Sequence, residues 1–172
     1  MISGRCSTGS NDLQTLGIEN EPVTTHQIED LVSLHPDIVC FGSQADCVGD
    51  DWIAKAEQRL GLELPGSYKW FLKTYAGGEI GTEEIYSIYG VDFEGVNGGD
   101  IVYQHIVGIK NNLVDGKKLV ISETDMGEVF FFDYSKFKDG ECPVNLRLPS
   151  GEDVNYASDF YEFLYKRISA HI

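Results

Sequence analysis

Residues 53–80, IAKAEQRLGLELPGSYKWFLKTYAGGEI, contain two amphipathic patterns separated by a short turn. In the first pattern, Ile53, Ala56 and Leu60 recur on one helix face before Gly61 ends the repeat. An aspartate just upstream, Asp50 or Asp51, is expected to cap this helix. The beginning of the quoted stretch therefore predicts a capped helix that buries one stripe.

The second pattern predicts another helix directly after the turn. Pro65 presets the turn, and four large side chains then repeat at i, i+3, i+4 and i+7: Tyr68, Phe71, Leu72 and Tyr75. Gly77 and Gly78 are expected to end this helix, because glycine adopts dihedral angles that other residues resist. Trp52 and Trp70 lie off the two stripes, so we consider them as exposed anchors for a partner.

The chain before residue 50 predicts a flexible tail and one short helix. Residues 1–21 are rich in Ser, Gly, Asn and Thr without periodicity and are interpreted as a flexible N-terminal tail. Thr24 and Gln27 have the spacing of a capping box, and an apolar repeat follows until Pro36. We expect residues 22–172 to form a single domain.

The chain after residue 80 predicts most of the strands. Strands are expected at residues 85–89, 119–122, 128–132 and 144–148, and a Gly-rich acidic loop at residues 91–100. Residues 101–113 fit either a strand or a helix capped by Asp100, and we favour the helix. A last helix should begin at a Ser158 cap and bury Phe160, Phe163, Leu164 and Ile168. This order predicts an α+β fold, with N-terminal helices and a C-terminal helix packed against a predominantly antiparallel sheet.

Residues 53–80 also resemble the signature of the SUKH superfamily. The matching residues are Ile53, Glu57, Leu60, Gly61, Leu64, Pro65, Ser67, Tyr68, Lys69, Phe71, Leu72, Gly77 and Gly78. The resemblance continues more weakly through residues 85–90, 119–133, 138–144 and 157–164. It implies a SUKH-like fold and a role like that of bacterial immunity proteins, which neutralise cognate toxins, frequently nucleases. Smi/Knr-like members in fungi regulate cell-wall synthesis, and the resemblance transfers no catalytic residue.

Composition limits the classes of partner and of chemistry. The 28 acidic residues against 13 Lys and Arg give a net charge of −15, which would be repelled by nucleic acid and anionic membranes. No nucleophile elbow, phosphate loop, dinucleotide motif or zinc motif is present, so we expect no enzyme, cofactor or metal. The four cysteines lack metal or disulfide spacing, and no signal peptide is recognised, so we expect a cytoplasmic protein.

These observations lead to a hypothesis about function. We expect an immunity protein that binds a cognate toxin with a basic surface; the alternative is a non-catalytic regulatory or scaffolding module, and the oligomeric state stays open. Residues 74–109 contain no Lys or Arg, and six carboxylates there are the expected contacts: Glu79, Glu83, Glu84, Asp92, Glu94 and Asp100. The competing interpretation is that Glu79 and Glu83 only solvate the turn that follows the helix.

Overall fold

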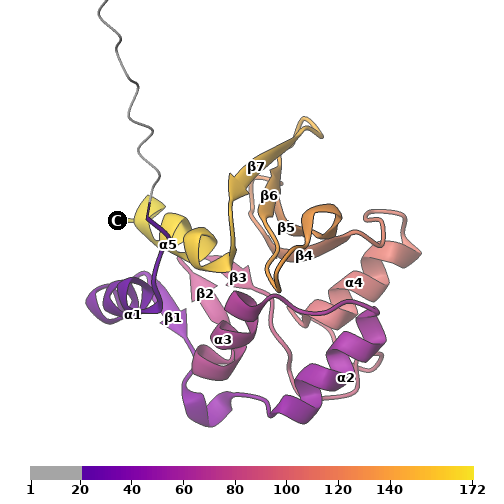
Figure 1. The fold of residues 1–172 in the computed structure, drawn as a ribbon, viewed down its shortest axis with the longest axis horizontal. Coiled ribbons are helices and arrows are strands. Elements are labelled where there is room, and N and C mark those ends of the chain that lie inside the picture. Colours follow the sequence, from indigo (N-terminus) through magenta and orange to yellow (C-terminus); the bar gives the residue numbers. More distant parts are fainter. Residues whose placement is uncertain (1–20) are drawn as a thin grey trace, which may run out of the picture.

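The computed structural model describes residues 21–172, so the tail predicted for residues 1–21 lies almost wholly outside the described residues (Figure 1). Helices pack against antiparallel sheets, which confirms the predicted α+β class. In chain order the elements are α1 (Thr25–Leu34), β1 (Val39–Phe41), η1 (Gln44–Asp46), α2 (Asp50–Leu60), α3 (Gly66–Tyr75), β2 (Gly78–Ile80), β3 (Glu83–Ile85), α4 (Ile101–Lys110), β4 (Lys118–Glu123), β5 (Val129–Asp133), η2 (Tyr134–Lys136), β6 (Val144–Arg147), β7 (Asp153–Ala157) and α5 (Phe160–Ala170).

The strands form two antiparallel sheets that meet at one edge. The small sheet has the order β1-β2-β3, and the large sheet has the order β4-β5-β6-β7. Just after β3, the Tyr86 N–H donates to the Ile121 carbonyl of β4 at 2.8 Å. The Ser122 hydroxyl donates to the Glu84 carbonyl, also at 2.8 Å. These two hydrogen bonds hold β3 beside β4 and fix the small sheet against the large one.

Helix α3 lies in the middle of the fold, between α2 and α5 (Figure 1). Its residues Tyr68, Phe71 and Leu72 are fully buried. The Tyr68 ring meets Phe160 of α5 at 5.0 Å and Phe132 of β5 at 5.5 Å between centroids. Such edge-to-face pairs stabilise a core beyond the area that they bury. Helix α3 therefore joins α5 and the large sheet into one core.

The first turn of α3 is held by a carboxylate from a distant loop. Glu141 accepts hydrogen bonds from the Ser67 N–H at 2.8 Å and from the Ser67 hydroxyl at 2.6 Å. The Ser67 oxygen in turn accepts a hydrogen bond from the Phe160 N–H of α5 at 3.3 Å. A negative charge is favourable at a helix N-terminus, where free N–H groups and the helix dipole meet. The serine of the quoted stretch thus connects the starts of α3 and α5.

Helix α5 also binds the small sheet through an ion pair. The Arg167 guanidinium donates to both carboxylate oxygens of Glu83 in β3, with Nε at 3.1 Å from Oε2. The two side chains are only 12% and 11% exposed. Helix α1 packs beside α5, as Figure 1 shows, and buries Ile28. The side of the small sheet that carries Glu83 is therefore an internal surface.

Two helix caps differ from the sequence predictions. Gly49, in extended backbone, is the N-cap of α2, whereas Asp50 and Asp51 lie in its first turn, where they still favour the helix dipole. The N-cap of α5 is Asp159, whose carboxylate accepts a hydrogen bond from the Glu162 N–H at 2.8 Å. Ser158 instead binds the Glu162 carboxylate at 2.7 Å. The Thr24–Gln27 capping box of α1 is confirmed.

The strand and loop predictions were correct only in part. Helix α4 with its Asp100 cap is confirmed, as are β4, β5 and β6. The strand predicted at residues 85–89 was wrong in its position, because β3 ends at Ile85. Helix α3 ends at Tyr75 with Ala76 as its C-cap, before the predicted glycines. Gly78 is instead the first residue of β2, with φ of 139°, packed so close to the Cys40 carbonyl that a side chain would overlap it. Strands β1, β2 and β7 were not predicted.

Candidate functional site

The outer side of the small sheet carries a row of three residues, one from each strand. Cys40 of β1 pairs with Glu79 of β2, and Glu79 pairs with Glu84 of β3. Residues directly opposite in neighbouring strands point to the same side of a sheet. Cys40 and Glu79 are exposed and Glu84 is half-buried, whereas the neighbouring Ile80 is buried on the other side. The fold therefore places two carboxylates side by side on an exposed sheet surface.

A tyrosine fixes the position of the Glu84 carboxylate. The Tyr89 hydroxyl donates to Glu84 Oε1 at 2.6 Å and accepts a hydrogen bond from the Gly99 N–H at 2.8 Å. Burial, together with this hydrogen bond to a negative carboxylate, raises the pKa of Tyr89 to about 12. A Cβ atom at Gly99 would overlap the Glu84 carboxylate, so a side chain at this position would displace the carboxylate. Glu84 is thus held in one orientation by groups that carry no positive charge.

A third carboxylate lies near the same place. Burial raises the pKa of Tyr86, and the negative charges of Glu123, at the end of β4, and of Glu84 raise it further. Glu123 directly follows Ser122 in β4, and the Ser122 hydroxyl binds the Glu84 carbonyl at 2.8 Å. We call Glu79, Glu84, Glu123 and Tyr89 the acidic sheet face. Among the described residues, no ion pair involves any of its three carboxylates.

The other carboxylates predicted as contacts lie elsewhere. Glu83 is on the internal side of the small sheet, paired with Arg167. Glu94 Oε1 lies 3.1 Å from Arg59 Nη2 of α2. The expectation that residues 74–109 have no counter-ions was therefore wrong for Glu83 and Glu94. Asp92 is exposed, and its side chain accepts a hydrogen bond from the Glu94 N–H at 3.2 Å. The structure therefore brings together only Glu79 and Glu84 of the six carboxylates.

The prediction that Asp100 contacts a partner was wrong. Its side chain is fully buried and accepts hydrogen bonds from the N–H groups of Val102 and Tyr103, each at 3.0 Å. Its second oxygen accepts a hydrogen bond from the Tyr89 N–H, also at 3.0 Å. One oxygen therefore caps α4 and the other binds Tyr89, so the buried Asp100 has no surface with which to contact a partner.

The sequence reasoning missed Tyr89 and Glu123. Tyr89 was assigned to the strand predicted at residues 85–89. In the structure β3 ends at Ile85, and Tyr89 lies beyond it with 41% of its surface exposed. Glu123 belongs to a strand that was expected to end at residue 122, and no local pattern places it near Glu84. The two tryptophans were also misjudged. Trp52 and Trp70 are half-buried, against Phe93 and Tyr161 respectively, so neither is a freely exposed anchor.

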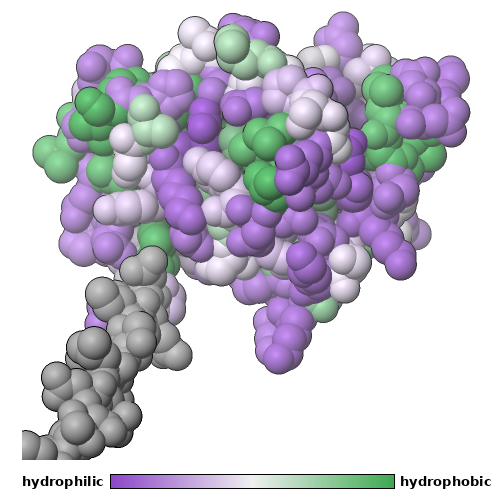
Figure 2. Space-filling model, turned by 90° about the horizontal axis from the view of Figure 1, so that it is seen from above, coloured by the Kyte–Doolittle hydropathy of each residue, from purple (hydrophilic) through white to green (hydrophobic). Residues whose placement is uncertain are grey.

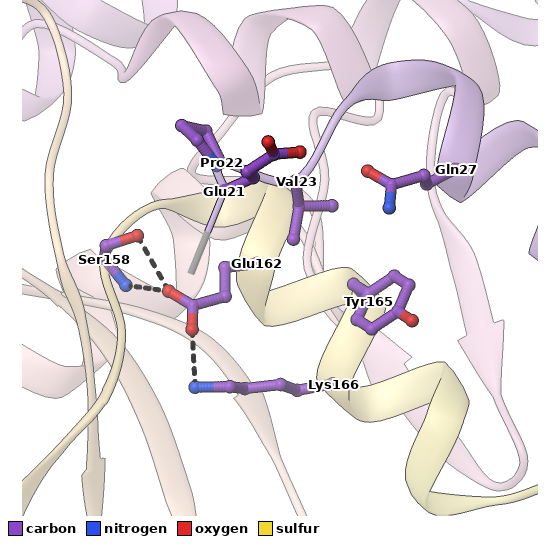
Figure 3. A pocket seen from close by; sticks show the side chains of 8 residues that line it. All are labelled: Glu21, Pro22, Val23, Gln27, Ser158, Glu162, Tyr165 and Lys166. Carbon is purple, nitrogen blue, oxygen red and sulfur yellow. Dashed lines mark hydrogen bonds and ion pairs between the residues drawn. The ribbon is translucent and has the colours of Figure 1, made fainter. Parts of the chain in front are cut away.

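A pocket of about 370 Å³ lies where the start of α1 meets α5, and three of its polar side chains, Ser158, Glu162 and Lys166, are already paired with one another (Figure 3). Glu162 points toward Ser158 and Lys166 and binds both, with Lys166 Nζ at 2.6 Å. Burial alone would raise the pKa of Glu162, yet the hydrogen bonds from Lys166 and Ser158 lower it. Glu162 is therefore an ionised structural group and not a proton donor.

Two further features bear on the class of site. Within residues 21–172, no cluster of three or more His, Cys, Asp or Glu side chains has a geometry that could hold a metal ion. None of the described helices is long and apolar enough to span a membrane. The acidic sheet face, by contrast, presents carboxylates without ion-pair partners among the described residues, and such a surface suits contact with a positively charged protein surface.

The family model that matches this chain is SUKH_6, described as SMI1-KNR4 cell-wall, and it covers residues 50–164. The chain belongs to the SUKH superfamily. The match begins at the first residue of α2 and ends within α5, so it includes β2, β3 and β4, which carry the acidic sheet face of this SUKH protein. Helix α1 and strand β1 lie outside the matched range.

Proposed function

We propose that this SUKH protein is an immunity protein that binds and neutralises a cognate toxin through the acidic sheet face. The superfamily, which includes toxin immunity proteins, supports the class of function. The observation that carries the choice of surface is the pair of Glu79 and Glu84, directly opposite each other with no cation beside them in the described residues. A toxin that acts on nucleic acid has to hold phosphates with Lys and Arg, and such a surface matches these carboxylates.

The carboxylate pair is unfavourable in the free protein and becomes favourable in a complex with a cationic partner. Like charges directly opposite in a sheet are unfavourable, and cross-strand pairs contribute about 0.2–1 kcal/mol. Glu79 is exposed, so solvent screening places its repulsion near the lower end of that range. A cation from a partner would replace this repulsion with charge-assisted hydrogen bonds. We therefore expect that removing these two charges leaves the folded protein as stable or slightly more stable, and weakens binding to the toxin.

The experiment uses the double variant Glu79→Gln and Glu84→Gln, which keeps shape and leaves an oxygen to accept the Tyr89 hydrogen bond. We expect it to unfold at the same or a slightly higher temperature than the wild type. Its association with the toxin encoded beside the gene, measured by stopped-flow at low and high salt, should slow about tenfold at low salt, a difference of about 1.4 kcal/mol. Growth protection in cells that express the toxin should fall in parallel.

A matched control removes the same charge from another exposed surface. Asp139 and Glu152 lie in turns outside the acidic sheet face and are both exposed. The variant Asp139→Asn with Glu152→Gln should leave association and protection unchanged. Equal on-rate, affinity and salt dependence for the two double variants would contradict the assignment of the acidic sheet face.

A regulatory or scaffolding role is the second candidate, because the matching family model is described as SMI1-KNR4 cell-wall. In that case the chain binds a partner of the cell-wall synthesis machinery and performs no chemistry itself. Binding and growth-protection assays on the wild type separate the candidates. Retained binding to such a partner, without protection from any toxin encoded nearby, favours regulation over immunity.

A further inference from the structure

A shallow groove with an apolar floor lies between α2 and α4. Leu60, Ile106 and Ile109 form the floor of this groove of about 330 Å³. Ile109 is 41% exposed and Leu113, just beyond α4, is 65% exposed. Figure 2 shows an apolar patch among hydrophilic side chains at the end of the molecule where Figure 1 places α4. This chain therefore leaves aliphatic surface open to solvent beside two helices.

The rim of the groove is positively charged in an otherwise acidic protein. Arg59 and Lys110 line it together with His105, and no carboxylate does. Arg59 has one partner, Glu94, in an ion pair that is largely exposed, and no ion pair among residues 21–172 involves Lys110. Burial and the nearby Arg59 lower the pKa of His105, so this side chain is neutral at pH 7. The charge at the rim thus comes from Arg59 and Lys110.

An aromatic hollow continues the groove past Arg59. This second hollow, of about 500 Å³, is lined by Trp52 and Phe93, whose rings meet edge to face at 5.6 Å between centroids. Lys55 Nζ lies over the Trp52 ring at 4.3 Å from its centroid. Arg59 lines both hollows, so the two are continuous along α2, and the second hollow is also lined by one carboxylate, Asp92. A peptide of a few residues could lie along the whole surface.

We propose that the groove between α2 and α4 is a docking site for a short acidic and aliphatic peptide segment of a partner protein. Aliphatic side chains of the segment lie on Leu60, Ile106 and Ile109, and its carboxylates lie between Arg59 and Lys110. This site is separate from the acidic sheet face and binds a partner of the opposite charge. It would allow the protein to hold a second chain while the first site is occupied.

Charge complementarity determines which occupant fits. An aliphatic segment without carboxylates would leave Lys110 unpaired as water is displaced, which is unfavourable, whereas Arg59 keeps Glu94 as a partner. A large acidic body would be repelled by the net charge of −15. At physiological salt, however, charges act over only about 8 Å, so a short segment in the groove responds mainly to Arg59 and Lys110. These conditions together favour a short segment over a whole acidic domain.

The experiment uses the full chain and a pair of short synthetic peptides. One peptide has a leucine face flanked by glutamates, and the other has lysines in place of the glutamates. The glutamate peptide should bind at least about tenfold more tightly in calorimetry and should shift the methyl resonances of Ile106 and Ile109. Lys110→Glu, an exposed substitution, should weaken this binding by about tenfold or more. Lys138→Glu, which makes the same charge change at an exposed site on another surface, should not.

Several results would overturn this assignment. Equal affinity for the two peptides would remove the role of charge, and unchanged binding by the Lys110→Glu variant would place the peptide elsewhere. Failure of the glutamate peptide to bind at millimolar concentration would show that the groove has no such ligand. Concentration-dependent dimerisation without peptide, abolished by Lys110→Glu, would make a second copy of this chain the occupant.

Discussion

Replacing Ser67 with alanine tests whether the contact between α3, Glu141 and α5 holds the fold together. The substitution removes the hydroxyl that donates to Glu141 at 2.6 Å and accepts from the Phe160 N–H at 3.3 Å. A hydrogen bond to a charged group contributes about 1.5–3 kcal/mol, and a buried donor left without a partner costs about 1–3 kcal/mol. Ser67 itself is fully buried, so water does not easily replace these partners.

We expect Ser67→Ala to lower the free energy of unfolding by about 3 kcal/mol. For a domain of this size, that loss corresponds to a fall in Tm of roughly 6–12 °C. Glu141→Ala should cost more, because it also removes the acceptor of the Ser67 N–H at 2.8 Å. The assay is urea unfolding of the wild type, both single variants and the double variant, combined as a double-mutant cycle.

The cycle gives a clear criterion. If the hydroxyl and the carboxylate interact as the distances indicate, the double variant loses less stability than the sum of the two single variants, by about 1 kcal/mol or more. Additive losses within about 0.3 kcal/mol would refute the reasoning. Glu141→Gln serves as the control for shape, because it keeps an oxygen near Ser67 and removes only the charge.

Two other perturbations test the electrostatics of the fold. Arg167→Met should lower the free energy of unfolding by about 3–5 kcal/mol, because it leaves Glu83 buried without its counter-ion, and adding Glu83→Gln should recover most of that loss in urea unfolding. The hydrogen bond from Arg147 lowers the pKa of Asp153 in the folded protein. The ionised Asp153 therefore stabilises the fold fully above about pH 4, the unfolded-state pKa of aspartate. This stabilisation is lost as the pH falls through the lower folded-state pKa. Asp153→Asn should therefore lower Tm at pH 7, and this difference should shrink below about pH 4.

The parts of the fold that were predictable are those specified by neighbours in sequence. The repeat from Tyr68 to Tyr75 and the stripe from Phe160 to Ile168 each lie within one helix, so their periodicity shows directly which residues are buried. Asp100 was recognised as a helix cap for the same reason. Strands β1, β2 and β3 have three residues each, too few for an alternating pattern, and β1 pairs with residues almost forty positions away.

The candidate site was harder to predict, because counter-ions come from distant positions in the sequence. The segment at residues 74–109 contains no base, yet Arg167 reaches Glu83 from 84 positions away and Arg59 reaches Glu94 from 35 positions away. Asp100 was expected both to cap α4 and to contact a partner, and its full burial leaves only the first role. Only the pairing of β2 with β3 shows that Glu79 and Glu84 lie side by side.

The contact at Ser67 also has a consequence for synthesis on the ribosome. Its two partners, Glu141 and Phe160, follow it in the chain by 74 and 93 residues. At about 5–20 residues per second, Ser67 waits roughly 5–19 s for Phe160 to be made. During that interval α3 lacks α5 and exposes the aromatic face of Tyr68 and Phe71. A chaperone that binds nascent chains would therefore have an opportunity to bind the aromatic face of α3.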